Sequence, residues 1–171
     1  MYKWLFFLFM SFNVFASPLK NLTKVGVGEM DYLFWTVYRA EYYLEDIDAR
    51  SQKTSPYVLE SDRVKALKIE YFKAIKSQVL IDATIDQWQS LGYPNTEIKS
   101  WVDKLRKIWP DVGVGNTLTV VVKKHDSHFY FNDSLIGSID DKRFGGAFLS
   151  IWLSKNTSYP DLRLQLLGQL P

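Results

Sequence analysis

The sequence of 171 residues contains no cysteine. Disulfide bonds, thiolate metal sites, iron–sulfur clusters, cysteine nucleophiles and lipoprotein anchors are therefore excluded. The sequence has only two histidines, so a histidine-rich metal site is not expected. Its 21 basic and 19 acidic residues give a net charge of +2, which creates no strong field for nucleic acid. We expect neither a metal ion nor a nucleic-acid partner.

Long hydrophobic runs are also lacking, except at the N-terminus. Lys3 precedes an apolar run over 5–15, and small residues stand at Val14 and Ala16. The run is too short to cross a bilayer of about 30 Å, and the pattern predicts a signal peptide over residues 1–16, cleaved after Ala16. No later run reaches the length of a membrane span, so we expect a periplasmic domain of residues 17–171 without stable membrane insertion.

The first half of the mature chain has the pattern of strands followed by two helices. Residues 25–44 are rich in aromatic and branched side chains without a helical period, which indicates two long strands or one bent strand, apolar on both faces. Residues 45–63 are expected to form a loop, and 66–73 alternate like a half-buried strand. Helical spacing then follows behind Ser77 and again behind Asn95, each of which could cap a helix.

The second half has the pattern of an antiparallel meander followed by two more helices. Alternation over 117–123 and the pair Asn132-Asp133 predict strands and a two-residue hairpin. Ser138 with Asp141 could cap a helix that buries Phe144 to Trp152, and a short helix ends at Gly168. The order predicts an α+β domain with a large antiparallel sheet and a layer of helices on one face.

Few local clusters suggest catalysis or cofactor binding. The segment His125-Asp126-Ser127-His128 is expected to be a solvated turn rather than a metal site, and no G-x-S-x-G motif supports a serine nucleophile. Gly26-Val27-Gly28 and Gly113-Val114-Gly115 are too short for nucleotide fingerprints and suggest sheet corners. We therefore expect no cofactor.

The strongest signal is the aromatic content of 16%. A sheet with helices on one face can hold a pocket lined by aromatic rings and a few hydroxyl groups, suited to an apolar ligand. The alternative is a fully packed core with tyrosines at its rim. From the residues alone, both interpretations stay open.

The order of motifs resembles the chalcone isomerase-like family, in its secreted bacterial branch, from about Val25 to Gly168. The segments that carry the resemblance are Gly26-Val27-Gly28, 37–44, 67–71, the helix ending in Trp88, Gly115-Asn116, 131–137, 144–147, 151–153 and 162–168. The resemblance implies a large antiparallel sheet layered with helices and a cleft between them. It also implies one of two functions, because some members cyclise chalcones without a cofactor and others bind fatty acids.

The catalytic residues of the isomerases do not carry over. The family's arginine position falls near Met30, its threonine position near Tyr38, and its tyrosine and asparagine positions near Gln78 and Ile85. Without the cation that stabilises the attacking phenolate, the electrostatic part of that mechanism is missing. Strand alternation turns Arg39 to the face opposite Tyr38, so Arg39 is not a substitute.

These arguments predict a non-catalytic domain that binds a small hydrophobic or fatty-acid-like ligand. We expect Tyr38 and Tyr71 to be its polar contacts, with Trp35 and Trp152 in the wall. One alternative is a cofactor-independent isomerase or lyase of an aromatic substrate, with a tyrosine hydroxyl in place of the arginine. Another is an envelope interaction protein with a filled cleft, docking through a basic helix face formed by Lys99, Lys104, Arg106 and Lys107.

Overall fold

One antiparallel sheet of six strands forms the centre of the molecule, in the order β1-β2-β3-β4-β5-β6. The computed structural model describes residues 17–32, 35–45 and 62–171. The strands are β1 (Leu22–Tyr32), β2 (Trp35–Glu45), β3 (Lys65–Tyr71), β4 (Thr117–Val122), β5 (Asp126–Phe131) and β6 (Ser134–Asp140). The expected leader and most of the expected loop over 45–63 lie outside the described residues.

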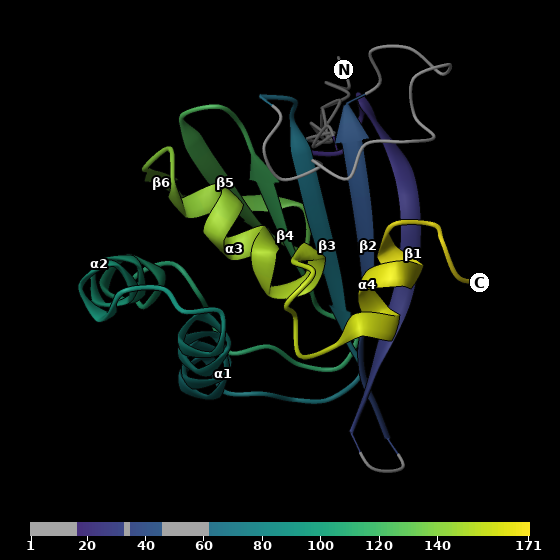
Figure 1. Ribbon diagram of the computed structural model, residues 1–171, viewed down its shortest axis with the longest axis horizontal. Helices are drawn as coiled ribbons and strands as arrows, with labels where there is room; N and C mark the ends of the chain where they lie inside the picture. The colour runs from purple at the N-terminus through teal and green to yellow at the C-terminus, as the bar shows by residue number, and fades with distance from the viewer. Residues whose placement is uncertain (1–16, 33–34, 46–61) are drawn as a thin grey trace, which may run out of the picture.

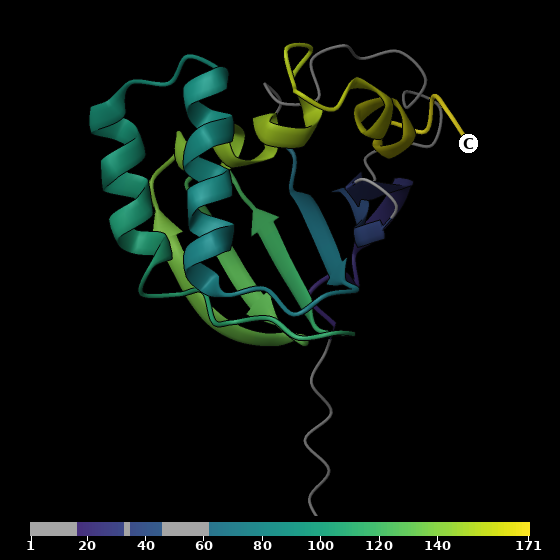
Figure 2. The same ribbon diagram turned by 90° about the horizontal axis from the view of Figure 1, so that it is seen from below.

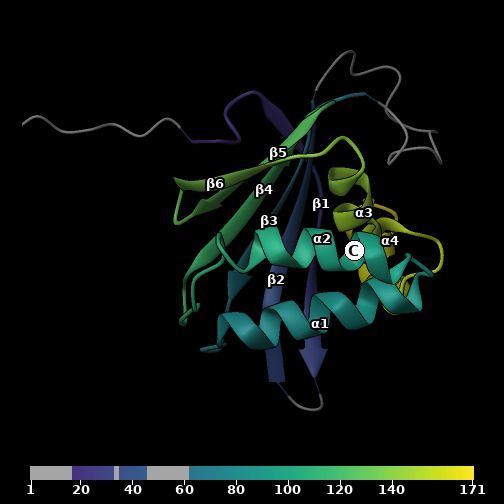
Figure 3. The same ribbon diagram turned by 90° about the vertical axis from the view of Figure 1, so that its left-hand side faces the viewer.

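Four helices cover one face of this sheet (Figures 1 and 2). They are α1 (Ser77–Ser90), α2 (Asn95–Leu105), α3 (Phe144–Leu153) and α4 (Pro160–Leu166). Figure 3 shows α1 and α2 running side by side in front of the strands. This is the expected α+β fold, with two layers around one core. Within the described residues, no helix is both long and apolar enough to span a membrane.

Strand alternation decides which side chains face the helices. In β3, Leu67, Ile69 and Tyr71 are buried while Lys68 and Glu70 are only partly covered, which confirms the expected pattern. The antiparallel register pairs Tyr71 with Tyr38 of β2, and pairs Leu67 with Val120 of β4. Directly paired residues share a face, so these side chains form the inner, helix-covered face.

The first two strands are amphipathic, so the expectation that both of their faces are apolar is wrong. The inner face of β2 buries Ala40, Tyr42 and Leu44. Its outer face carries Arg39, which pairs with Glu29 at 2.8 Å, and Glu41, which pairs with Lys24 at 2.6 Å. The aromatic residues of β2 hid this alternation, since Tyr42 is buried on the inner face whereas Tyr43 lies on the outer face and donates a hydrogen bond to Glu41.

The starts of the helices differ from the sequence prediction. Neither Ser77 nor Asn95 caps a helix, since both are the first helical residues behind Lys76 and Pro94. The Asp111 carboxylate instead accepts the Ser77 amide at 2.9 Å and the Lys76 ammonium at 2.8 Å. A residue distant in sequence thus satisfies the free amide at the start of α1.

The start of α3 is organised by Asp141 rather than Ser138, which lies within β6. One Asp141 oxygen accepts the Arg143 amide at 2.9 Å, and the other accepts the Trp101 indole N–H at 3.1 Å. Gly145 permits the expected close approach of α3 to the sheet, because a Cβ atom there would lie 2.9 Å from Ser127 Oγ. Gly146 has open space instead.

Glycines in β1 position the last helix. Gly26 and Gly28 lie inside the strand, so the expected sheet corner is wrong there. A Cβ atom at Gly26 would lie 2.6 Å from the Leu166 carbonyl oxygen, and one at Gly28 would lie 2.6 Å from a Leu162 methyl carbon. Their missing side chains let α4 pack directly on the strand.

The two remaining turn predictions are confirmed. Asn132 and Asp133 have φ angles of 47° and 66°, the left-handed conformation that a two-residue hairpin of this type needs. Gly115, with φ of 80°, lies in the turn before β4.

Tryptophan and phenylalanine rings fill the core between the helices and β5. Trp88 of α1 is fully buried, and its indole N–H donates to the Ala147 carbonyl at 2.8 Å. Its ring lies 5.1 Å from Trp101 and 6.1 Å from Phe144, centroid to centroid. Much of the aromatic excess therefore forms an ordinary packed core, as one of the two interpretations expected.

Candidate functional site

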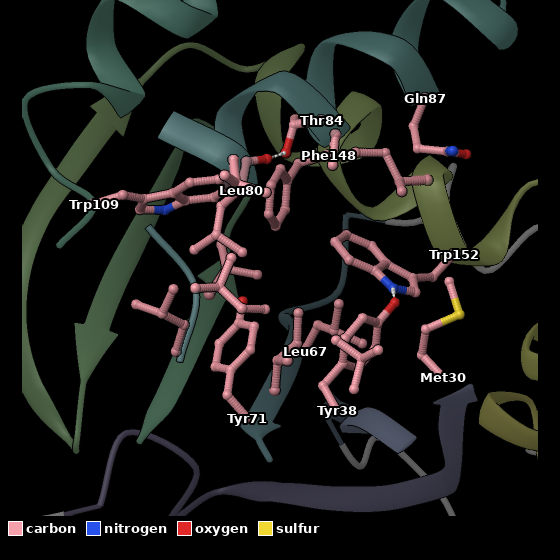
Figure 4. A pocket seen from close by; sticks show the side chains of 18 of the residues that line it. Met30, Tyr38, Leu67, Tyr71, Leu80, Thr84, Gln87, Trp109, Phe148 and Trp152 are labelled. Atoms are coloured by element: carbon pink, nitrogen blue, oxygen red, sulfur yellow. Dashed lines mark hydrogen bonds between the residues drawn. The ribbon is translucent and has the colours of Figure 1, made fainter. Parts of the chain in front are cut away.

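The core is not filled throughout, because a cavity of about 480 Å³ remains between the sheet and the helices (Figure 4). Such a volume lies within the usual range of about 300–1,000 Å³ for small-molecule sites. Its wall consists of Met30, Asp31, Tyr32, Val37, Tyr38, Leu67, Ile69, Tyr71, Ile75, Val79, Leu80, Ala83, Thr84, Gln87, Trp109, Leu118, Thr119, Val120, Phe129, Phe148, Ile151, Trp152 and Tyr159. The cleft is therefore open, contrary to the filled-cleft alternative.

Local sequence patterns bring the wall together. The sheet side consists mainly of the inner residues of β1 to β5, which alternate with outward-facing residues. The helix side comes from Leu80 and Thr84, spaced by four residues on α1, and from Phe148 and Trp152 with the same spacing on α3. Residues four apart lie on one face of a helix, so both helices present an apolar stripe to the cavity.

We place the mouth of the cavity between the end of β1 and α1, because the exposed residues of the described wall lie there. Among the described wall residues, Asp31, Tyr32, Val79 and Ala83 are exposed to solvent. Tyr32 is 70% exposed and Val79 is 56% exposed. Large apolar side chains with this exposure form a hydrophobic rim beside the opening.

Tyr38 and Trp152 form the main polar contact inside. The Trp152 indole N–H donates to the Tyr38 hydroxyl oxygen at 2.9 Å, as the dashed line in Figure 4 marks. Burial raises the pKa of Tyr38 to about 12, while the Trp152 hydrogen bond opposes this shift and the nearby Tyr159 adds to it. Tyr38 is thus a neutral phenol at physiological pH, and its own O–H hydrogen has no acceptor among the described residues.

Tyr71 supplies a second hydroxyl group. Its ring meets that of Tyr38 edge-on, with centroids 6.2 Å apart. The hydroxyl makes no hydrogen bond to the described residues, and burial raises the Tyr71 pKa well above its usual value. Three of the four residues expected to contact a ligand, Tyr38, Tyr71 and Trp152, therefore lie at the cavity.

Trp35 does not lie at the cavity, so its assignment to the wall is wrong. It is 62% exposed at the first position of β2, and the Lys73 ammonium lies 4.1 Å above its ring. Trp35 is the first residue of β2 and pairs with the exposed Tyr32 at the hairpin end. Its odd spacing of three residues from Tyr38 does not by itself predict a common face with Tyr38.

The cavity wall contains hardly any charge. Among the described wall residues, Asp31 is the one with a carboxylate, and none has a basic side chain. Asp31 accepts a hydrogen bond from the Thr36 hydroxyl at 2.7 Å. The arrangement can solvate an apolar molecule and offer hydrogen bonds from neutral hydroxyl groups.

The positions inferred for isomerase chemistry can now be placed. Met30 pairs with Tyr38 across β1 and β2 and lines the cavity. The position near which the isomerases carry their arginine therefore has an uncharged thioether. Gln78 and Ile85 are outside the wall, whereas Leu80 and Gln87, each two residues later, belong to it. Arg39 lies on the outer face with Glu29, as strand alternation predicted.

The other candidate clusters are not part of the cavity. Asp126 and His128 lie in β5 rather than in a turn. Among the residues described, no group of three or more histidine, cysteine, aspartate or glutamate side chains could hold a metal ion. On the basic helix face, Lys99 pairs with Asp103 at 2.9 Å and Arg106 lies 3.9 Å from the same carboxylate. Asp103 therefore partly neutralises the basic helix face.

Sequence reasoning missed several wall residues, above all Leu80, Thr84, Gln87 and Trp109. The first three carry the helical spacing of a buried face, but that spacing does not distinguish a face against a cavity from one against side chains. Trp109 follows the end of α2 and packs its ring against Phe129 and Phe148. Trp109 reaches the cavity because of the turn after α2, and a periodic sequence pattern does not predict the course of such a turn.

Comparison with known proteins agrees with this architecture. A protein of Haemophilus influenzae without a described function is 25% identical over 154 residues, which is 90% of this chain and 72% of that protein. The crystal structure of a fatty-acid binding protein of Arabidopsis thaliana superposes with a TM-score of 0.66 at 12% identity, covering 89% of both chains. The family model described as chalcone isomerase-like matches residues 16–168. With this match and this fold, the chain belongs to the chalcone isomerase-like family.

Proposed function

We propose that the protein binds a small hydrophobic ligand, without transforming it, in the cavity between the sheet and α1 and α3. The observation that carries this proposal is the apolar cavity of about 480 Å³ with an opening beside Tyr32 and Val79. An empty apolar space of this size forfeits packing interactions, and an apolar ligand would regain them. The structural neighbour from Arabidopsis is named a fatty-acid binding protein, and this supports the same class of ligand.

The chemistry of the wall favours binding over isomerisation. A tyrosine that acts as a general base needs a pKa near the working pH. Burial instead raises the pKa values of Tyr38 and Tyr71 further above that pH. Met30 provides no positive charge for an anionic intermediate. The described cavity does provide what binding of an apolar ligand needs, namely an apolar wall with a few neutral hydroxyl groups.

A variant that blocks the opening tests the proposal. Ala83 lies at the mouth on α1, so Ala83→Trp is expected to abolish binding of a neutral environment-sensitive dye such as Nile red. The matched control is Gln89→Trp, which adds the same ring to an exposed position of α1 outside the wall. Fluorescence titration of the three proteins measures the effect. Dye binding that is equal in wild type and Ala83→Trp would place the ligand elsewhere.

We also propose that the domain acts in the periplasm after removal of residues 1–16. The family match begins at residue 16, where the expected leader ends, and this agreement supports the proposal. Expression in a Gram-negative host should yield a periplasmic protein that begins at Ser17 in N-terminal sequencing. A cytoplasmic protein with an intact N-terminus would contradict it.

A further inference from the structure

We infer that the ligand is an uncharged molecule with a long apolar part and a neutral hydrogen-bond acceptor, such as an ester or a ketone, rather than a free carboxylate. This inference rests on the proposed function and specifies its ligand. It depends on three features of the cavity: the missing positive charge in the described wall, a Tyr38 hydroxyl hydrogen without an acceptor among the described residues, and the low polarity around that hydroxyl.

Charge is the first argument. An ionised carboxylate that leaves water needs a cation or several hydrogen-bond donors, because burial of an unpaired charge is strongly unfavourable. The described wall contains no lysine, arginine or histidine. Asp31 is exposed at the mouth and would repel an anion that enters. On β2, Arg39 directly follows Tyr38 but lies on the outer face in an ion pair with Glu29.

Hydrogen bonding is the second argument. The Tyr38 oxygen accepts the Trp152 indole N–H, an arrangement that orients the phenol and leaves its O–H free to donate. A second hydroxyl group, that of Tyr71, also makes no hydrogen bond to the described residues. Figure 4 shows Tyr38 beside Trp152 and Tyr71 on the same side of the cavity, with Leu67 between the two tyrosines and Phe148 on the opposite side. The Tyr38 hydroxyl beside Trp152 fits a carbonyl oxygen, and the remaining wall fits hydrocarbon.

The third argument concerns the strength of these donors. The raised pKa of Tyr38 shows that its environment disfavours the phenolate. The same low-polarity surroundings strengthen a hydrogen bond to a neutral carbonyl, while they penalise a full negative charge on a ligand. The Tyr38 hydroxyl can therefore satisfy an ester or ketone oxygen, but it does not replace the cation that a carboxylate needs.

Paired ligands that differ in charge test the inference. Dodecanoic acid and methyl dodecanoate share one hydrocarbon chain, and at about pH 8 the acid is ionised. Displacement of Nile red from the wild-type protein is expected to need at least tenfold more dodecanoate than ester. At about pH 5, where the acid is partly neutral, the difference should shrink. Tighter binding of dodecanoate at pH 8 would overturn the inference, although the proposed binding function would stand.

A tyrosine pair on the two faces of β2 tests the donor. Tyr38→Phe is expected to weaken methyl dodecanoate binding about three- to tenfold, the usual effect of one neutral hydrogen bond, and to weaken dodecane binding less. Tyr43→Phe is the control, since Tyr43 lies on the outer face and its hydroxyl donates to Glu41. Equal ester binding by wild type and Tyr38→Phe would remove Tyr38 as the donor.

Infrared spectroscopy gives a readout that does not depend on affinity. The carbonyl stretch of bound methyl dodecanoate should shift to lower frequency in wild type and return in Tyr38→Phe. An unshifted band in wild type would contradict the inference. If neither Nile red nor any of the three ligands binds to the wild-type protein, the proposed function itself fails, and that outcome is distinct from every result above.

Discussion

Two tryptophans illustrate how differently equal side chains contribute to this fold. Trp88 has no exposed surface and donates a hydrogen bond to the Ala147 carbonyl, whereas Trp35 is 62% exposed with Lys73 above its ring. Burial of a large ring stabilises the folded state, while an exposed cation–π contact contributes only about 0.5–1 kcal/mol.

We therefore predict that Trp88→Ala lowers the free energy of unfolding by about 3–5 kcal/mol, because it leaves a large cavity. Trp35→Ala should change it by less than about 1 kcal/mol. Urea unfolding followed by circular dichroism measures both values. Similar losses in the two variants would show that the aromatic cluster around Trp88 is not the stabilising core.

At the scale of secondary-structure elements, the contact between β1 and α4 is set by missing side chains. Gly26 faces the last turn of α4 so closely that a Cβ atom there would overlap the backbone carbonyl of Leu166. Backbone atoms of a helix cannot move aside as a flexible side chain can. The strand and the helix must therefore separate if a side chain is added.

Gly26→Ala is accordingly expected to destabilise the protein by about 1–3 kcal/mol, the usual cost of overpacking. Gly146→Ala is the matched control, since Gly146 lies inside α3 and has open space around its Cβ position. There, alanine should stabilise the helix by up to about 1 kcal/mol. Midpoints of thermal unfolding compare the two variants, and a stabilised Gly26→Ala would refute the close approach.

At the scale of the whole molecule, buried phenols link stability to alkaline pH. Burial is the main cause of the raised pKa values of Tyr38, Tyr42 and Tyr71. In the unfolded chain such phenols lose their protons near pH 10, whereas Tyr38 retains its proton up to about pH 12 in the folded state. Between these values the unfolded state binds fewer protons, so stability falls as pH rises.

The free energy of unfolding should therefore be insensitive to these groups below about pH 9 and then decrease, by at most about 1.4 kcal/mol per pH unit for each buried phenol. Tyr38→Phe should make the decrease less steep between about pH 10 and pH 12. Urea unfolding at a series of pH values measures the slope. A slope in Tyr38→Phe equal to that of wild type would mean that Tyr38 ionises freely in the folded state.

Much of the fold could be predicted because local patterns reflect burial directly. The alternation of Leu67, Ile69 and Tyr71 against Lys68 and Glu70 identified a strand and its inner face, and the structure confirms both. Asn132-Asp133 identified a hairpin because few residues tolerate positive φ angles. The order of motifs identified the family, and the family match over 16–168 agrees.

The candidate site was only partly predictable. The structure places Tyr38, Tyr71 and Trp152 at the cavity, where the inner faces of neighbouring strands meet a facing helix. Trp35 lies outside the wall, at the exposed hairpin end of β2 beside Lys73. The contact of Asp111 with the start of α1 was not predicted either, because a partner so far away in sequence leaves no local pattern.

The sequence by itself thus determined most of the secondary structure, the inner face of β3 and the absence of thiol chemistry, because these depend on the order and type of neighbouring residues. Only the tertiary structure decided that a cavity remains between the sheet and the helices and that the Tyr38 hydroxyl accepts the Trp152 indole N–H there. Whether side chains fill a space depends on the distance and angle between packed elements. Residues far apart along the chain set that geometry jointly, so no single stretch of sequence contains it.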